Sequence, residues 1–308
     1  MKITIIGAGN VGASCASLLA QKDIVKKIVL LDIREKFSEG KSLDISQMLS
    51  IMESNTEIIG SNNYYKSKNS EIIIITCGVP RKPGMSRDDL INTNAEIISF
   101  VTKKSIFLSP KAKFIIVSNP LDVMAYVSYM TAKIDSSRII GMAGILDSTR
   151  YRFFLSKKIN VSPIDIQSLL LGGHGDTMVP LYRYTSVSGI PIKEFLSEEE
   201  NDIIIDKTKK GGEEIVNLLG TSAWMAPSAS VVKIVESILK DSKRIFSCSA
   251  FLTGQYGLKN LFLGVPVILG KSGIEKIVEL RLNQKENNLL KKSADHVLNM
   301  ISKLDKFD

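Results

Sequence analysis

His174 is the residue of this 308-residue chain whose chemistry is best suited to proton transfer near neutral pH. It lies in the glycine-rich segment 172–177, directly after an apolar run, whereas the other histidine, His296, lies in a lysine-rich segment near the C-terminus. The glycines on both sides of His174 leave room for a ligand beside an imidazole that can give or take a proton. Because a single histidine is more often structural than catalytic, this hypothesis needs support from other residues.

A carboxylate and a guanidinium stand three residues apart at Asp147 and Arg150, where a predicted helix begins. Residues at this spacing lie side by side on one helix face, so an ordinary intrahelical ion pair is the default interpretation. A second interpretation links both residues to the distant histidine. Asp147 would orient and charge His174, while the two-pronged guanidinium of Arg150 would bind a substrate carboxylate.

Cations also gather in the segment 78–89, which follows an apolar run and contains Arg81, Lys82 and Arg87. Its prolines and glycines exclude a continuous helix or strand, so we predict a loop. Such a loop is usually only a solvated surface feature. This one starts at the carboxyl end of a predicted parallel strand, as does Ser118-Asn119-Pro120, and open parallel sheets bind ligands at that edge.

The segment Gly7-Ala8-Gly9-Asn10-Val11-Gly12 follows the first predicted strand and opens a predicted helix. In this pattern the first glycine allows a tight turn, the second lets the backbone approach a pyrophosphate, and the third allows close helix packing. Asp32 lies 20 positions after Gly12, where its carboxylate can accept hydrogen bonds from an adenosine ribose. The sequence therefore predicts a dinucleotide site that favours NAD, although Arg34 is a residue type that can receive the NADP phosphate.

These candidate residues lie at the ends of apolar strands that alternate with longer helical segments. Continuous β-branched runs separated by helices predict a parallel sheet that is covered on both faces. We therefore predict an α/β protein whose residues 1–143 form an N-terminal Rossmann domain with a doubly wound parallel sheet. Its clearest strands are expected at 3–6, 28–31, 72–76 and 114–118, and its helices at 11–21, 38–52, 89–107 and 123–131.

The pattern changes beyond about Gly144, and we predict a C-terminal, mixed α/β substrate domain over residues 144–308. No repeat or low-complexity linker separates the two halves, so we expect an extensive interface between them. The expected elements of this domain are a helix at its start, a strand at 166–171, a long helix at 198–219 and a hairpin-like pair at 261–278.

The composition narrows the class of protein. A content of 44% hydrophobic residues suffices for an ordinary core, and the N-terminus lacks an export-signal pattern. The longest nearly uncharged apolar stretch, 261–270, is about half as long as a membrane span. The net charge of +8 is spread along the chain without the clustering of a nucleic-acid interface. We therefore expect a cytoplasmic protein that binds neither membrane nor nucleic acid.

Cysteine usage agrees with this location. Cys15, Cys77 and Cys248 are far apart and lie among apolar neighbours. Such an arrangement is typical of reduced core thiols rather than of a disulfide framework or a metal cluster. We expect no metal site.

Taken together, the motifs resemble those of the lactate/malate dehydrogenase family over essentially the whole chain. The resemblance implies that His174 donates and accepts the proton, that Asp147 is its partner, and that Arg150 binds the C1 carboxylate of a small 2-hydroxy or 2-oxo acid. It also implies that Arg87 polarises the reacting carbonyl and that Asn119 contacts the substrate. The segments that carry the resemblance are 7–12, 81–87, 117–120, 147–150, 172–180 and 256–267.

The resemblance also completes the expected NAD site. It implies that Asn94, Val117 and Asn119 help the glycine-rich turn to hold the cofactor. The turn itself would contribute Gly7, Gly9, Asn10, Val11 and Gly12, with Asp32 at the ribose.

Arg81 stands where the malate-specific members of this family tend to carry arginine and the lactate-specific members glutamine. A second substrate carboxylate, as in oxaloacetate, needs a second cation in a closed site, whereas pyruvate would leave that cation unpaired and desolvated. The resemblance therefore implies a dicarboxylate substrate, and Gly173 agrees because lactate-specific members commonly have Glu before the histidine. Trp224 points the other way, since it resembles the lactate-specific pocket.

Two alternatives remain open. The chain could act on lactate and pyruvate, or it could be a catalytically silent NAD-binding protein that retains only the fold. The loss of His174, Asp147 or Arg150 would mark a silent protein, and all three are present. Departures from the family pattern are Cys77, where a small alanine is usual, and the segment 46–55. We expect a homo-oligomer, either a dimer or a tetramer.

Overall fold

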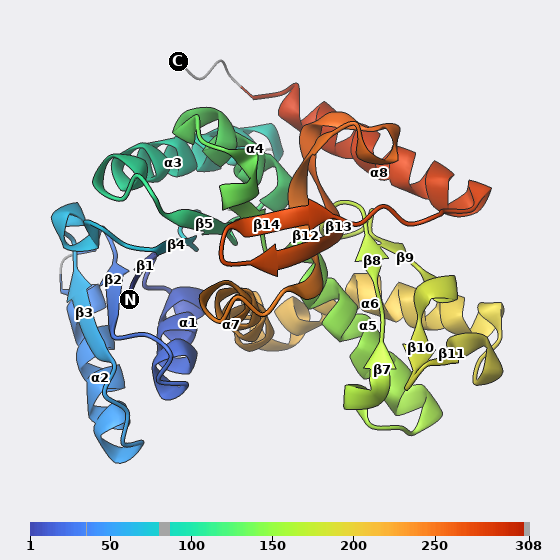
Figure 1. Ribbon diagram of the computed structural model, residues 1–308, viewed down its shortest axis with the longest axis horizontal. Coiled ribbons are helices and arrows are strands. Elements are labelled where there is room, and N and C mark those ends of the chain that lie inside the picture. Colours follow the sequence, from blue (N-terminus) through green and yellow to red (C-terminus); the bar gives the residue numbers. More distant parts are fainter. Residues whose placement is uncertain (35, 80–86, 305–308) are drawn as a thin grey trace.

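The computed structural model describes residues 1–34, 36–79 and 87–304, and of residues 87–89 only the backbone. It is an α/β fold with helices on both faces of a central sheet (Figure 1). The strands are β1 (Lys2–Ile6), β2 (Lys27–Leu31), β3 (Glu57–Ser61), β4 (Ile72–Ile75), β5 (Lys113–Ile116), β6 (Ile139–Gly141), β7 (Ile166–Gln167), β8 (Leu170–Leu171), β9 (Val179–Pro180), β10 (Ser186–Val187), β11 (Ile190–Pro191), β12 (Arg244–Thr253), β13 (Lys259–Gly270) and β14 (Gly273–Ile277). The α-helices are α1 (Asn10–Gln21), α2 (Phe37–Ile51), α3 (Arg87–Leu108), α4 (Leu121–Ala132), α5 (Ala143–Ile159), α6 (Glu198–Leu219), α7 (Met225–Leu239) and α8 (Gln284–Ile301), and the 3₁₀ turns are η1 (Tyr64–Ser67), η2 (Ser136–Arg138), η3 (Pro163–Asp165), η4 (Tyr182–Tyr184), η5 (Ile192–Glu194) and η6 (Gln255–Gly257).

The parallel half of the sheet has the strand order β3-β2-β1-β4-β5-β6, which is that of a doubly wound dinucleotide-binding fold. Ile3 of β1 pairs in parallel with Ile28 of β2 on one side and with Ile72 of β4 on the other. The order reverses between β1 and β4, so the carboxyl ends of these two strands flank the crevice where such sheets bind ligands. The structure confirms the predicted Rossmann architecture.

Side chains of each parallel strand are buried on both faces, because successive residues of a strand point to opposite sides. Ile72 and Ile74 join the core that contains residues of α1, α2 and α7. Ile73 and Ile75 join the opposite core, with residues of α3 and α4. Figure 1 shows these helix groups on opposite sides of the sheet. Burial on both faces explains why the strands are continuous apolar runs in the sequence.

Three antiparallel strands extend the sheet beyond β6. Ser249 of β12 pairs with Gly141 of β6, and β12, β13 and β14 then follow one another in antiparallel order. The predicted hairpin at 261–278 corresponds to β13 and β14. The strand β12 next to it was not predicted.

Two sequence-based predictions need correction. The strand predicted at 166–171 is divided into β7 and β8, because β7 pairs with β10 whereas β8 pairs with β9. The helix predicted to begin at Asp147 begins at Ala143, so Asp147 and Arg150 lie inside α5 rather than at its first turn.

The long helix α6 has the predicted bounds, and its two ends explain them. Ser197 accepts a hydrogen bond from the Glu200 backbone while the Glu200 side chain accepts one from the Ser197 backbone, which forms a capping box. Gly220 ends the helix in a left-handed conformation with φ 70°.

The described residues have two further general properties. Cys15, Cys77 and Cys248 are all free thiols. In the described part of the chain, no helix combines the length and the apolar character needed to cross a membrane.

Candidate active site

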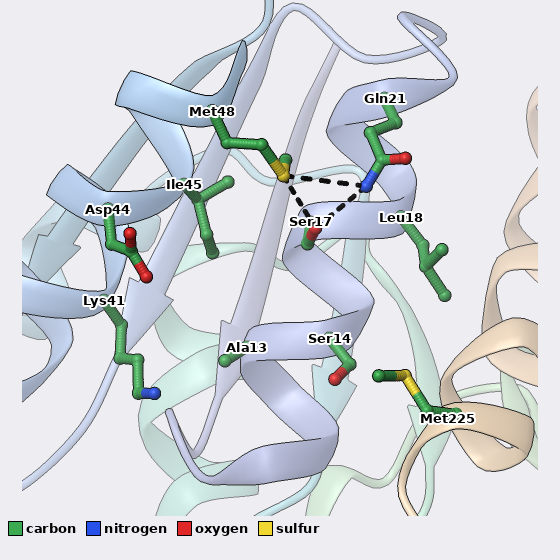
Figure 2. Close-up of a pocket in the computed structure, with 10 residues that line it drawn as sticks. All are labelled: Ala13, Ser14, Ser17, Leu18, Gln21, Lys41, Asp44, Ile45, Met48 and Met225. Carbon is green, nitrogen blue, oxygen red and sulfur yellow. Dashed lines mark hydrogen bonds between the residues drawn. The ribbon is translucent and has the colours of Figure 1, made fainter. Parts of the chain in front are cut away.

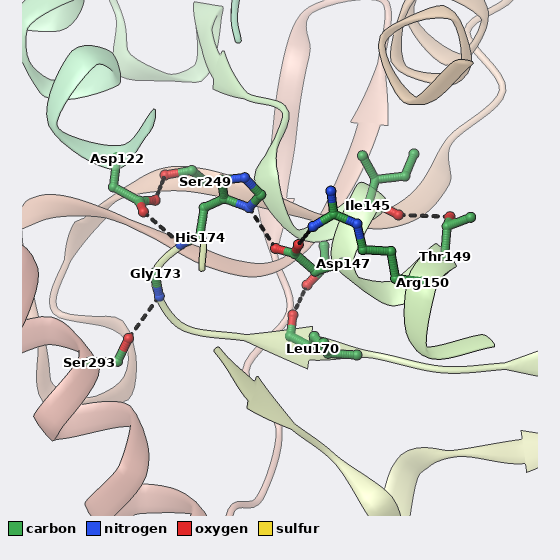
Figure 3. Close-up of polar contacts among 11 residues, drawn as sticks. Asp122, Ile145, Asp147, Thr149, Arg150, Leu170, Gly173, His174, Ser249 and Ser293 are labelled. Carbon is green, nitrogen blue, oxygen red and sulfur yellow. Dashed lines mark hydrogen bonds and ion pairs between the residues drawn. The ribbon is translucent and has the colours of Figure 1, made fainter. Parts of the chain in front are cut away.

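His174 and Asp147 lie side by side in the structure, although 27 positions separate them in the sequence. Nδ1 of His174 is 2.8 Å from Oδ2 of Asp147 (Figure 3). The two side chains are 17% and 3% exposed. With the Nδ1 proton donated to this carboxylate, Nε2 is the ring atom left for a substrate, and it has no hydrogen-bond partner among the described residues.

Opposing effects set the pKa of His174. Burial lowers the pKa because it disfavours the charged imidazolium, and the guanidinium of Arg150 acts in the same direction. The negative charge and the hydrogen bond of Asp147, together with the charge of Asp122, raise the pKa by more. The net result is a pKa above the usual value of histidine, so this environment favours the protonated imidazole.

Arg150 approaches the same carboxylate from the same helix face. Its Nη1 lies 3.6 Å from Oδ1 of Asp147, too far for a good hydrogen bond, and its side chain is 17% exposed. Oδ1 of Asp147 is buried and has no hydrogen-bond partner among the described residues. The ion pair is therefore long, and the guanidinium keeps donors for a carboxylate brought by a ligand.

The backbone around His174 is fixed by two other side chains. The Gly173 N–H donates to Oγ of Ser293 on α8 at 2.8 Å, and the His174 N–H donates to Oδ2 of Asp122 on α4 at 2.9 Å (Figure 3). Oγ of Ser249 on β12 donates to the other oxygen of Asp122 at 2.5 Å. Asp122 is 3% exposed, and burial raises the pKa of its carboxyl group.

These three supporting residues, Asp122, Ser249 and Ser293, were not predicted from the sequence. Asp122 and Ser293 contact residues 174 and 173 across at least 52 positions of sequence, and Ser249 contacts Asp122 across 127. The closest available signal was the position of Asp122 three residues after Asn119, inside an otherwise apolar helix.

The glycine-rich turn has the geometry of a pyrophosphate-binding site. Gly7 has φ 104°, and a Cβ on Gly12 would lie 1.8 Å from the carbonyl oxygen of Gly7, so both positions need glycine. A Cβ on Gly9, in contrast, would meet nothing within 4 Å. Gly9 is the N-cap of α1, and no side chain caps this helix end. Free helix N–H groups beside an open surface suit a phosphate, and Asn10 and Val11 form the first positions of the helix.

Asp32 lies at the end of β2 beside this turn. Its Oδ2 accepts hydrogen bonds from the Ala8 N–H at 2.9 Å and from Nη2 of Arg34 at 3.0 Å, and its Oδ1 accepts from the backbone N–H and Nε of Arg34. The guanidinium of Arg34 also stacks on Phe37, 3.5 Å from the ring centroid. Burial opposes ionisation, but these hydrogen bonds from Arg34 and Ala8 hold the pKa of Asp32 below its usual value. A carboxylate whose pKa is lowered in this way, beside the turn, suits ribose hydroxyls.

Asn94 connects the two loops that follow β4 and β5. Its Oδ1 accepts from the Val79 N–H at 2.8 Å, and its Nδ2 donates to the carbonyl oxygens of Val79 and Asn119 at 3.2 and 3.0 Å. The amide therefore supports the walls of the predicted cofactor site through their backbone. Val117 is 9% exposed at the end of β5, and Asn119 is exposed just before α4.

Two predicted substrate-binding side chains cannot be placed. Arg81 lies outside the described residues. Helix α3 begins at Arg87, but the structure describes only the backbone of this residue.

A cavity of about 430 Å³ lies apart from these residues, between α1, α2 and Met225 of α7. Figure 2 shows Ser17, Gln21 and Met48 joined by hydrogen bonds along its wall. None of the predicted site residues lines it. In the described part of the chain, no group of three or more His, Cys, Asp or Glu side chains could hold a metal ion.

Known proteins resemble this chain over nearly its full length. Residues 1–141 match the model of the lactate/malate dehydrogenase NAD-binding domain, and residues 145–308 match the model of the α/β C-terminal domain of the same family. A malate dehydrogenase from Cytophaga hutchinsonii is 51% identical over 99% of this chain and 98% of its own.

Solved structures give the same result. The structure of malate dehydrogenase from Salinibacter ruber has a TM-score of 0.95 and 45% identity, and the match covers 98% of this chain and 97% of that one. A lactate dehydrogenase from Eimeria maxima with NADH and oxamate has a TM-score of 0.94 and 41% identity, with 98% and 93% covered.

Proposed function

The chain belongs to the lactate/malate dehydrogenase family, and from this premise we propose that it interconverts malate and oxaloacetate with NAD as its cofactor. The observation that carries the proposal is the contact of His174 with Asp147 beside a long, incomplete ion pair to Arg150. A proton carrier next to a cation with free donors is the arrangement that a 2-hydroxy acid dehydrogenase needs.

The residues present fit NAD. The open surface at Gly9 and the uncapped start of α1 suit the pyrophosphate. The ionised Asp32 suits the adenosine ribose. When bound here, NAD would supply the hydride acceptor for malate oxidation, and NADH the hydride donor for oxaloacetate reduction. Gly7, Gly12, Asn10 and Val11 shape this surface. Val117, Asn94 and Asn119 form its wall at the strand ends.

His174 moves the proton of the reaction. In oxaloacetate reduction, the protonated ring donates from Nε2 to the developing alkoxide while Nδ1 keeps its hydrogen bond to Asp147. The carboxylate stabilises the imidazolium before the transfer. In malate oxidation, the neutral ring accepts the hydroxyl proton at the same atom.

Arginines hold the substrate and stabilise its charge. Arg150 binds the C1 carboxylate with the donors that Asp147 leaves free. On the basis of the family resemblance, Arg81 binds the second carboxylate, Arg87 polarises the carbonyl when its loop closes, and Asn119 contacts the substrate.

Lactate dehydrogenase activity is the alternative, supported by Trp224 at the N-cap of α7 and by the similarity to lactate dehydrogenase structures. Initial rates of NADH oxidation with oxaloacetate and with pyruvate, measured in parallel, separate the two activities. We expect kcat/KM for oxaloacetate to exceed that for pyruvate by about 100-fold or more, since pyruvate has no second carboxylate to pair with the second cation that we assign to Arg81. A preference for pyruvate would refute the proposal, and no turnover of either acid would favour a silent NAD-binding protein.

We also propose that the protein is a cytoplasmic homo-oligomer with domains 1–143 and 144–308. Large apolar side chains that are more than half exposed support self-association, among them Leu43 and Ile51 on α2 and Met225 on α7. Light scattering coupled to size exclusion tests this, and a single species at the mass of one chain would contradict it.

A further inference from the structure

Asp122 is a buried carboxylate to which the chemistry described above gives no part. It lies in the first turn of α4, three residues after Asn119, and it is 3% exposed. Both of its oxygens accept a hydrogen bond, one from the His174 backbone N–H and one from the Ser249 hydroxyl (Figure 3). It therefore connects α4, β12 and the segment that carries the proton donor.

Hydrogen bonding alone does not explain a carboxylate at this position. Its two partners are neutral donors, and no Lys or Arg among the described residues forms an ion pair with it. Burying a carboxylate without a cation is costly, whereas an asparagine could serve both partners without a charge. An uncharged side chain already does this one residue earlier, where the Ser293 hydroxyl accepts a hydrogen bond from the Gly173 N–H.

Among the described residues, three charged side chains lie near the imidazole of His174. Asp147 and Arg150 reach it from α5, and Asp122 reaches its backbone from α4. The other side chains that anchor this segment, Ser249 on β12 and Ser293 on α8, are neutral. Burial raises the pKa of the Asp122 carboxyl group, but the hydrogen bonds from Ser249 and His174 and the charge of a protonated His174 act in the opposite direction. In its ionised form Asp122 therefore adds its negative charge to that of Asp147 and counteracts the positive charge of Arg150.

We propose that Asp122 is a positioning residue for His174, which fixes the His174 backbone through a hydrogen bond and stabilises the protonated imidazole through its negative charge. The proposal rests on the proposed function for its catalytic meaning. It links the loop after β5, which bears Asn119, to the proton donor in the C-terminal half, so the substrate contact and the proton keep a fixed relative position.

The test compares Asp122→Asn with the matched control Ser293→Ala. Asparagine keeps the shape, an acceptor for the His174 N–H and a donor for the Ser249 hydroxyl, so it removes mainly the charge. Ser293→Ala removes a neutral anchor of the same segment. Both variants perturb the backbone locally, but only the first should change the electrostatic environment of the imidazole.

The first readout is the titration of His174 by NMR of the histidine-labelled protein without substrate. The chain has two histidines, so His296→Gln assigns the signals. We expect Asp122→Asn to lower the titration midpoint of His174 by about half a pH unit or more, and Ser293→Ala to leave it in place. This readout does not depend on turnover, so it stands even if the enzyme proves inactive toward malate.

The second readout is the pH dependence of kcat/KM in both directions. Because the charge favours imidazolium, Asp122→Asn should move the high-pH loss of oxaloacetate reduction and the low-pH loss of malate oxidation to lower pH together. Ser293→Ala should lower rates without moving either midpoint. An unmoved NMR midpoint in a folded Asp122→Asn variant would overturn the proposal. So would equal shifts in both variants, because they would indicate a merely structural effect.

Discussion

The pair formed by Asp32 and Arg34 gives the most quantitative prediction about cofactor choice. Asp32 receives four hydrogen bonds, three of them from Arg34, at 2.9 to 3.0 Å. Replacing Asp32 by Ser removes the proposed ribose acceptor and the repulsion toward a 2′-phosphate, and it also releases the guanidinium. A hydrogen bond to a charged group contributes about 1.5–3 kcal/mol, which is about 10- to 150-fold in binding.

The loss of the ribose acceptor and the release of the Arg34 guanidinium both lower the ratio of kcat/KM for NAD to that for NADP. Arg34 is 54% exposed, so the lower end of the range applies to its new phosphate contact. We expect Asp32→Ser to lower kcat/KM for NAD by about tenfold or more and to raise that for NADP by about tenfold. The ratio should therefore fall by about 100-fold.

The double variant Asp32→Ser, Arg34→Gln isolates the role of the arginine. It should lose NAD activity as the single variant does but gain little NADP activity, because no guanidinium is left to receive the phosphate. Initial rates with both cofactors at saturating malate measure this, with melting temperatures as a check on folding. An unchanged ratio in Asp32→Ser would show that Asp32 does not face the ribose, and equal NADP gains in both variants would refute the role of Arg34.

Three other outcomes are expected. His174→Asn should abolish turnover while NADH affinity, followed by fluorescence titration, stays nearly constant, and a collapse of NADH binding would mark the histidine as structural. Gly9→Ala should weaken NADH binding by about tenfold or more while the free energy of unfolding changes by less than about 1 kcal/mol. The reason is that the added methyl group meets only the proposed pyrophosphate surface. Unaltered NADH affinity would place the pyrophosphate elsewhere. Because the pKa of His174 is raised, the protonated form should persist above the usual histidine pKa. Oxaloacetate reduction should therefore remain fast at neutral pH and fall as pH rises through the raised pKa, while malate oxidation increases. A pH profile in which reduction is already lost below the usual histidine pKa would contradict the assignment.

The parallel part of the fold could be predicted because its signals are local. Strands such as β4 are buried on both faces and are uninterrupted isoleucines in the sequence. In the first turn, Gly12 is required by the carbonyl oxygen of Gly7, five residues earlier. The capped helix α6 has start and stop signals in adjacent residues. Such features need no knowledge of the tertiary structure.

Features that depend on distant partners could not be predicted in the same way. The division of 166–171 into two strands follows from pairing with β9 and β10, which no local pattern specifies. The sequence shows Asp122 only as an acidic residue at the start of a largely apolar helix, and its contacts with Ser249 and the His174 backbone depend on the tertiary fold. From the residues alone, the pairing of His174 with Asp147 was one of two interpretations, and the family resemblance favoured it. The assigned roles of these residues remain predictions.

The substrate assignment depends on Arg81, and the most direct measurement is the ratio of kcat/KM for oxaloacetate to that for pyruvate in the wild type and in Arg81→Gln. Truncating one partner of a buried charge pair typically costs about 2–5 kcal/mol, so kcat/KM for oxaloacetate should fall by about 30-fold to several thousand-fold. Activity with pyruvate should hold steady or rise, because the closed site no longer desolvates an unpaired cation. The ratio cancels general damage to folding or loop closure. A ratio that changes by less than about threefold would mean that Arg81 does not meet the second carboxylate, and it would contradict the assignment of malate as the substrate.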